Sequence, residues 1–157
     1  MTDRVRESLF SSIAARIPNS RVFDLYAGTG SLGLEALSRG AGMVTFVERD
    51  RRALEALRRN IESVGLGGTV VAGEVDGFLA RGGTDCDIAF VDPPYALSLP
   101  SLVETVGNLS HLVARDGLVI VHRRSGEEPP AGITGLAIVD ERNYGSAVIW
   151  RYAKEDT

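Results

Sequence analysis

Residues 22–38 read VFDLYAGTGSLGLEALS, and this stretch decides the fold. An apolar run predicted as a strand at Val22–Tyr26 enters a glycine turn, and the pattern after the turn predicts a helix at Leu32–Arg39. Residues 28–33 match the pattern G-x-G-x-x-G, in which glycines let the backbone and the helix start approach a nucleotide-type ligand closely. The stretch therefore predicts a cofactor site at the end of the first strand. The alternative is that these glycines only make a strand-to-helix turn.

The rest of the chain alternates short apolar runs with helical periods, which indicates an α/β fold. Strands that are nearly continuous apolar runs are typical of a parallel sheet covered by helices on both faces. The last two strands have no helix between them, and residues 141–146 have the composition of a hairpin loop, so one antiparallel strand is expected near a sheet edge. We expect seven strands in one domain spanning residues 1–157. The further predicted strands are Met43–Glu48, Thr69–Ala72, Asp87–Val91, Leu118–His122, Leu136–Asp140 and Ala147–Tyr152, and the further helices are Thr2–Ile17, Arg51–Val64, Val75–Arg81 and Leu99–Leu112.

Composition limits the class of protein. With 157 residues, 44% hydrophobic and 24% charged, the chain is expected to form one globular domain with a substantial core. It contains no long apolar segment and its first residues are charged, which predicts a cytoplasmic protein without a membrane span. The net charge of −4 argues against broad electrostatic binding to nucleic acid but leaves room for a local basic face. Cys86, His111 and His122 do not have zinc-ligand spacing, so a metal-free mechanism is expected.

Two acidic residues near the glycine turn indicate which cofactor it holds. Glu48 ends the second predicted strand, 20 positions after Gly28, where a carboxylate can accept hydrogen bonds from ribose hydroxyls. This arrangement fits a nicotinamide dinucleotide. Asp24, however, would repel a pyrophosphate and attract a cationic amino group, which favours a nucleoside joined to an amino acid, as in S-adenosylmethionine. Both cofactor classes remain open at this point.

A second motif, Asp92-Pro93-Pro94-Tyr95, directly follows the apolar run that ends at Val91. Neither proline can donate to a sheet, and the first one favours an extended Asp92, so the strand is predicted to stop there. The freed carboxylate and carbonyl oxygens can accept both hydrogens of one –NH2 group while Tyr95 stacks on its ring. The motif thus predicts a site for a planar amine. The simpler interpretation is an ordinary turn after a strand.

Together these residues resemble the class I methyltransferases, and more closely the RsmD-type small-subunit ribosomal RNA guanine-N2 methyltransferases. The resemblance extends over essentially the whole chain and implies a Rossmann-like fold. Members of the family usually carry a further N-terminal segment, a basic glycine-rich hairpin, and this chain begins where that segment would end. The resemblance rests on Thr2–Phe10, the run from Asp24 to Gly40, Phe46-Val47-Glu48, Val91–Tyr95 and Tyr144-Gly145.

The resemblance also implies a reaction and its residues. Methyl transfer from S-adenosylmethionine to the N2 amine of a guanine in 16S ribosomal RNA, in an assembling or assembled 30S particle, is the expected activity. Asp92 and the Pro93 carbonyl would stabilise the charge that develops on nitrogen, and Tyr95 would stack on the extruded base. The implied catalytic residues are Asp92, Pro93, Pro94 and Tyr95, and the implied cofactor site comprises Asp24, Tyr26, Ala27, Gly28, Thr29, Gly30, Glu48, Arg49, Glu74, Val75 and Asp92.

Several alternatives stay open from the sequence. Glu74 could accept from the adenine amine or simply favour the start of a helix. Arg4, Arg6, Arg123 and Arg124 could contact phosphate or be exposed surface charges. The same acceptor pair could hold an adenine N6 amine or a glutamine amide, and a cofactor-binding ribosome-assembly module without catalysis is a further alternative.

Overall fold

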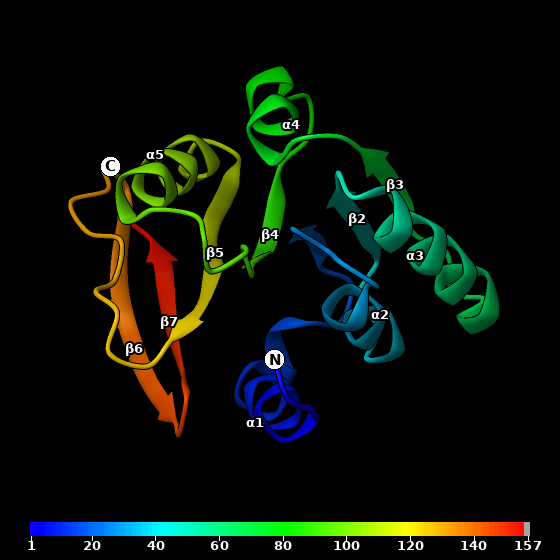
Figure 1. Ribbon diagram of the computed structural model, residues 1–157, viewed down its shortest axis with the longest axis horizontal. Helices are drawn as coiled ribbons and strands as arrows, with labels where there is room; N and C mark the ends of the chain where they lie inside the picture. Colours follow the sequence, from blue (N-terminus) through cyan, green and yellow to red (C-terminus); the bar gives the residue numbers. More distant parts are fainter. Residues whose placement is uncertain (156–157) are drawn as a thin grey trace.

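The computed structural model describes residues 1–155, which form one α/β unit (Figure 1). The helices are α1 (Asp3–Ile13), α2 (Ser31–Ser38), α3 (Arg51–Val64), α4 (Val75–Arg81) and α5 (Leu99–Ser110). The strands are β1 (Arg21–Leu25), β2 (Met43–Glu48), β3 (Thr69–Ala72), β4 (Cys86–Val91), β5 (Val113–Arg124), β6 (Leu136–Tyr144) and β7 (Ala147–Lys154).

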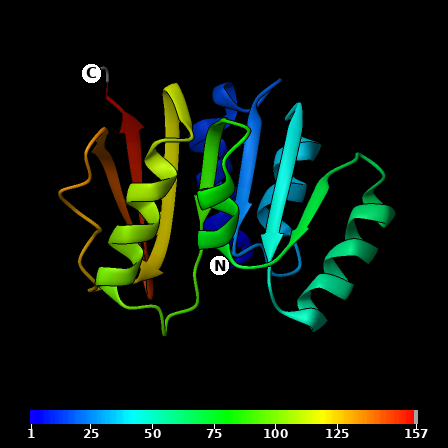
Figure 2. The same ribbon diagram turned by 90° about the horizontal axis from the view of Figure 1, so that it is seen from above.

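The strands form one seven-stranded sheet in the order β3-β2-β1-β4-β5-β7-β6. Strands β1 to β5 are parallel, whereas β7 is antiparallel to both β5 and β6, as the strand directions in Figure 2 show. The predicted sheet, with one antiparallel strand next to its edge, is therefore confirmed. The chain builds outward from β1 to β3 and then returns to β4 on the other side of β1. This reversal creates a crevice at the carboxyl ends of β1 and β4, where ligands bind in open α/β sheets.

Side chains on each strand alternate between two cores, one on each face of the sheet. On β1, Val22 packs into the core shared with α1, α2 and α3, while Phe23 packs into the core shared with α4 and α5. The two layers of helices lie on opposite sides of the sheet (Figure 2). Burial on both faces explains why the central strands are continuous apolar runs in the sequence.

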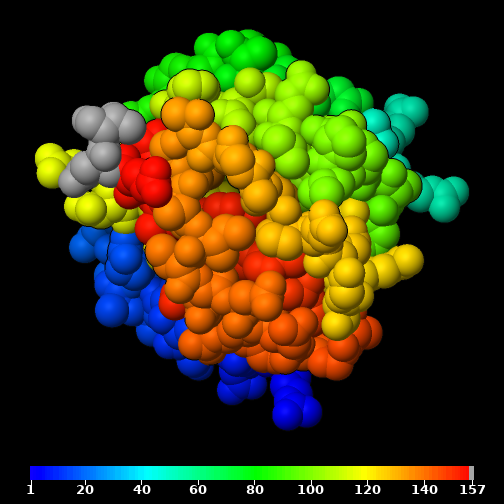
Figure 3. Space-filling model, turned by 90° about the vertical axis from the view of Figure 1, so that its left-hand side faces the viewer, coloured from blue at the N-terminus to red at the C-terminus, as the bar shows by residue number. Residues whose placement is uncertain are grey.

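Three predicted elements differ from the structure by four residues or more at one end. Strand β5 begins at Val113, five residues before its predicted start at Leu118, because the exposed Arg115 and Asp116 interrupt the apolar pattern. Helix α1 ends at Ile13, and a 3₁₀ turn at Ala14–Arg16 follows, because the Ile17 N–H bonds the Ala14 carbonyl and Pro18 has no N–H to extend the helix. The predicted hairpin loop at residues 141–146 shrinks to two residues, since β6 continues to Tyr144. Residues 141–144 instead belong to β6, an edge strand that is largely exposed. The surface of β6 lies at the centre of Figure 3.

Three further findings concern the cysteine, membrane-spanning helices and metal-binding clusters. Cys86 is buried, and burial raises the pKa of its thiol to about 12, so it is a core thiol. Among residues 1–155, no helix is both long and apolar enough to cross a membrane. No cluster of three or more His, Cys, Asp or Glu side chains that could hold a metal ion occurs in the same range.

Candidate active site

A cleft runs along the carboxyl ends of β1, β2 and β4. It consists of a cavity of about 400 Å³ and a smaller one of about 200 Å³, and both are lined by Tyr26 and Asp92. The glycine turn and the Asp-Pro-Pro-Tyr motif, far apart in the sequence, thus face the same space. Of the residues implied by the resemblance, Asp24, Ala27, Gly28 and Thr29 line the smaller cavity, and Glu48, Arg49, Glu74, Val75 and Pro94 line the larger one.

The turn after β1 is shaped by left-handed backbone and by close packing. Tyr26 has φ of 59°, an uncommon conformation for a residue with a side chain, and such strain concentrates at functional sites. Gly28 also has φ of 59°, and nothing lies within 4 Å of where its Cβ would be, so space for a ligand remains above the turn. Gly33 serves packing instead, because a Cβ there would come within 2.3 Å of the Phe46 ring. Gly30 caps α2 and is likewise packed, so it lies outside the cleft lining.

Glu48 holds the glycine turn. Its Oε1 accepts a hydrogen bond from the Gly28 N–H at 2.8 Å, and its Oε2 accepts from the N–H groups of Arg49 and Asp50 at 2.9 and 2.7 Å. A carboxylate offers about four lone-pair positions, so these three bonds leave capacity for a ligand hydroxyl. The residue predicted to bind ribose therefore also orients the turn that borders the cleft.

Asp24 is a buried carboxyl beside the smaller cavity. It is 1% exposed and accepts a hydrogen bond from the Gly33 N–H at 2.9 Å. Its pKa is raised to about 8, chiefly by burial; the Gly33 hydrogen bond opposes the rise, and the charges of Asp92 and Glu48 add to it. A carboxyl in this environment is stabilised as the anion when a cationic group enters the cavity.

Glu74 and Arg49 form an ion pair at the edge of the larger cavity. The Arg49 Nη1 lies 3.1 Å from the Glu74 Oε1, and both side chains are 67% exposed, so the pair contributes little to stability. Glu74 precedes α4 without capping it through its side chain, whereas Val75 is buried and lines the cavity.

The loop after β4 is held from both faces of the sheet by consecutive residues of β5. The Asp92 Oδ1 lies 2.8 Å from the His122 Nδ1. Arg123 points to the opposite face, where its guanidinium donates to the carbonyl oxygens of Pro94, Tyr95 and Leu97 at 3.1, 3.3 and 2.9 Å. Strand β5 thereby fixes the position of the whole motif.

Both alternatives that the sequence left open for Arg123 are wrong. It is 3% exposed and forms an ion pair with Glu127, so it is neither a phosphate contact nor an exposed surface charge. Sequence reasoning also missed His122 as a site residue. The sequence shows only that three polar residues follow the apolar run of β5; that His122 meets the motif depends on the register that pairs Val121 with Val91.

Tyr95 and Pro93, the remaining residues of this motif, differ in their exposure to solvent. Tyr95 is 47% exposed, and the Arg124 guanidinium carbon lies 4.3 Å from its ring centroid, so Arg124 covers one face of the ring. Pro93 is buried and does not line the cleft. Within residues 1–155 no protein donor bonds the Pro93 carbonyl oxygen.

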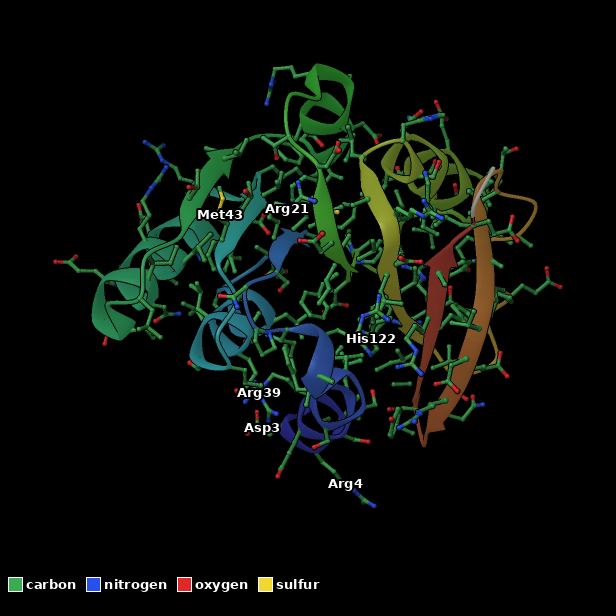
Figure 4. All side chains as sticks on the ribbon, turned by 180° about the vertical axis from the view of Figure 1, so that it is seen from behind. Asp3, Arg4, Arg21, Arg39, Met43 and His122 are labelled. Atoms are coloured by element: carbon green, nitrogen blue, oxygen red, sulfur yellow. The ribbon has the colours of Figure 1, made fainter. Side chains whose placement is uncertain are left out.

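The two N-terminal arginines differ from each other. Arg4 is exposed and projects away from α1 (Figure 4). Arg6 lines the smaller cavity and forms ion pairs with Asp3 and Glu35 at 3.3 and 3.6 Å. Arg6 is thus part of the cleft wall, whereas Arg4 remains a candidate for phosphate contact.

Comparison with known proteins agrees with this arrangement. The family described as "Conserved hypothetical protein 95", the RsmD family, matches residues 1–153. Ribosomal RNA small subunit methyltransferase D of Escherichia coli (strain K12) is 36% identical over 157 residues, which cover 98% of this chain and 78% of that protein. The chain belongs to the RsmD family. A second relative, the putative rRNA methyltransferase YlbH of Bacillus subtilis (strain 168), is 30% identical over 98% of this chain and 86% of its own length.

Solved structures place this RsmD-family member among Rossmann-like methyltransferases. The putative methyltransferase yhhF from Escherichia coli superposes with a TM-score of 0.88 at 36% identity, covering 98% of this chain and 86% of that one. SMU.776, a putative methyltransferase complexed with SAH, shares the fold at a TM-score of 0.78 and 16% identity, covering 96% of this chain and 48% of that one. Membership in the RsmD family decides against the nicotinamide-binding alternative and confirms the methyltransferase prediction.

Proposed function

We propose that this chain binds S-adenosylmethionine in the cleft and transfers its methyl group to the N2 amine of a guanine in 16S ribosomal RNA. The observation that carries the proposal is that Asp92 lines both cavities, so the amine-binding motif borders the space beside the glycine turn. The similarity to ribosomal RNA small subunit methyltransferase D supports ribosomal RNA as the substrate class. A 30S particle, assembling or assembled, is the proposed form of that substrate.

The cleft fits the proposed cofactor in charge and in shape. A cationic amino group in the smaller cavity would convert the buried Asp24 carboxyl to its anion, and the open space above Gly28 leaves room for the chain that carries it. Glu48 retains acceptor capacity for ribose hydroxyls. Val75 and Leu97 supply apolar contact in the larger cavity, and Glu74 stands at its edge as an acceptor for an adenine amine.

The substrate amine is proposed to lie between Asp92 and the Pro93 carbonyl. Neither the Pro93 oxygen nor the Asp92 Oδ2 accepts a hydrogen bond from residues 1–155, so each can accept one hydrogen of the –NH2 group. The base would stack on the face of Tyr95 that Arg124 leaves free, or displace the Arg124 side chain.

The chain promotes the reaction through orientation and charge. S-adenosylmethionine, when bound, supplies an electrophilic methyl group on a sulfonium. A guanine N2 amine is a weak nucleophile because its lone pair is delocalised, and it gains positive charge as it attacks. Asp92 and the Pro93 carbonyl stabilise that charge more strongly than they stabilise the neutral amine, which lowers the barrier. Holding both reactants in one cleft raises the rate further, because the reacting atoms no longer have to meet by diffusion.

Methylation of alternative substrates tests the proposal. The chain is incubated with labelled S-adenosylmethionine and, separately, with undermethylated 30S particles, naked 16S RNA, DNA or a glutamine-containing release-factor peptide. Digestion and mass spectrometry should find N2-methylguanosine from the ribosomal substrates, and the Asp92→Asn variant controls for contaminating activity. N6-methyladenine or methylglutamine as the main product would overturn the assignment. Cofactor binding without turnover on any substrate would favour a non-catalytic assembly module.

A further inference from the structure

His122 is a buried polar residue at the end of β5 that the proposed chemistry has not yet used. It is 3% exposed, and the register that pairs Val121 with Val91 places it beside Asp92. Figure 4 shows His122 at the end of β5 near α1. Its Nδ1 lies 2.8 Å from the Asp92 Oδ1, while its Nε2 is the one buried side-chain nitrogen or oxygen among residues 1–155 without a hydrogen-bond partner.

The pairing with Asp92 determines which nitrogen carries the proton. An ionised carboxylate only accepts hydrogen bonds, so the His122 Nδ1 must be the donor. The Nε2 on the other side of the ring is then left in a buried position without a partner. Leaving a buried polar atom unpaired costs free energy, and such an atom requires an explanation.

Packing alone does not explain a histidine at this position. Leu118 and Ile120 precede it on the same face of β5, and Ile149 is its partner on β7; all three belong to the apolar core. An apolar side chain here would avoid the unpaired nitrogen. The contact that an apolar residue could not supply is the hydrogen bond to Asp92.

We propose that His122 is a positioning residue for methyl transfer, acting through its Nδ1–H bond to the Asp92 Oδ1. The terminal torsion of an aspartate is broad and lets the carboxylate rotate, so a fixed donor on one oxygen directs the other, Oδ2, to the substrate amine. This inference rests on the proposed function and adds a residue to it.

Two substitutions separate positioning from a structural role. His122→Leu removes the donor, and His122→Asn places an amide N–H near the position of Nδ1. Single-turnover methyl transfer on undermethylated 30S particles should fall roughly 10- to 100-fold in the Leu variant, the scale of a misplaced reacting group. The Asn variant should recover most of the rate. Thermal unfolding of the Leu variant should be unchanged or shifted upward, and its S-adenosylhomocysteine affinity should stay within about 3-fold of the parent.

Nitrogen-15 NMR of histidine-labelled protein provides a readout that does not depend on turnover. His122, assigned by its absence from the Asn variant, should show a protonated Nδ1, and Asp92→Asn should shift that signal. An unprotonated Nδ1 in the free protein, or a Leu variant that transfers methyl at the parental rate, would overturn the inference while the proposed function stands. If the parent chain methylated no ribosomal substrate, the proposed function itself would fail and this inference with it.

Discussion

Glu48 accepts a hydrogen bond from the backbone N–H of Gly28 at 2.8 Å, so the acidic end of β2 holds the glycine turn that follows β1. The bond joins two segments 20 residues apart. It means that the proposed ribose contact and the shape of the turn depend on one carboxylate.

Replacing Glu48 should therefore weaken cofactor binding strongly. Glu48→Ala removes a charged acceptor from the ligand and releases the turn, so a loss of about 1.5–3 kcal/mol, or roughly 10- to 100-fold in Kd for S-adenosylhomocysteine, is expected. Calorimetric titration measures it, with Glu55→Ala on the exposed face of α3 as the control. Unchanged affinity would remove Glu48 from the cofactor site.

Asp24 predicts a pH dependence of stability. Its pKa is about 8 in the folded protein and near 3.8 in the unfolded chain, so between these values the folded state binds one more proton. The free energy of unfolding must then fall as pH rises through this window, because the unfolded chain loses that proton at a lower pH than the folded protein does. Asp24→Asn abolishes this penalty, and its melting temperature should exceed that of the parent by more at pH 8 than at pH 5. A constant difference would show that Asp24 is not protonated in the free protein.

The same carboxyl predicts proton release on cofactor binding. A cationic amino group beside Asp24 favours its anion, so S-adenosylhomocysteine should bind more tightly at pH 8 than at pH 6, with release of a proton. Calorimetry in buffers of different ionisation enthalpy counts the protons. In Asp24→Asn this dependence should vanish; if it persists unchanged, another group is responsible.

Asp92 should affect chemistry far more than cofactor binding. Asp92→Asn removes the negative charge that faces the developing cation, so the single-turnover rate is expected to fall roughly 10²- to 10³-fold. Affinity for S-adenosylhomocysteine should change by less than about 3-fold. Asp85→Asn, in an exposed loop, is the matched control. If the Asn variant transferred methyl at the parental rate, Asp92 would be only a turn residue without a role in catalysis.

Tyr95 should act on the RNA step alone. Loss of base stacking in Tyr95→Ala is expected to weaken productive RNA binding by about 1–3 kcal/mol, seen as a raised KM for 30S particles. Tyr95→Phe keeps the ring and should behave like the parent. If both variants lose activity equally, the hydroxyl rather than the ring is important.

Arg123 should stabilise the protein through the loop that it holds. Arg123→Lys cannot bond three carbonyl oxygens and Glu127 together, so unfolding in urea should show a loss of roughly 2–4 kcal/mol. Arg124→Lys, at the neighbouring exposed position, should change stability by less than about 0.5 kcal/mol. Amide hydrogen exchange of residues 95–98 should speed up only in the Arg123 variant.

The sequence alone was sufficient for the fold class and for the two motifs. Strands buried on both faces must be apolar throughout, and the glycine turn and the paired prolines restrict the backbone locally, so both leave a direct trace in residue order. The bounds of β2, β3, α3 and α4 were predicted as the structure has them. The edge strand β6 was predicted too short, because a strand exposed to solvent has a composition close to that of a loop.

Tertiary structure alone decided how the motifs are held. Nothing in the residue order shows that Glu48 supports Gly28, that His122 meets Asp92, or that Arg123 is buried beneath the loop after β4. Each of these contacts crosses between neighbouring strands, and its partner is set by sheet order and register. Local sequence patterns report what one segment of chain favours, whereas burial and pairing depend on which other segments lie beside it.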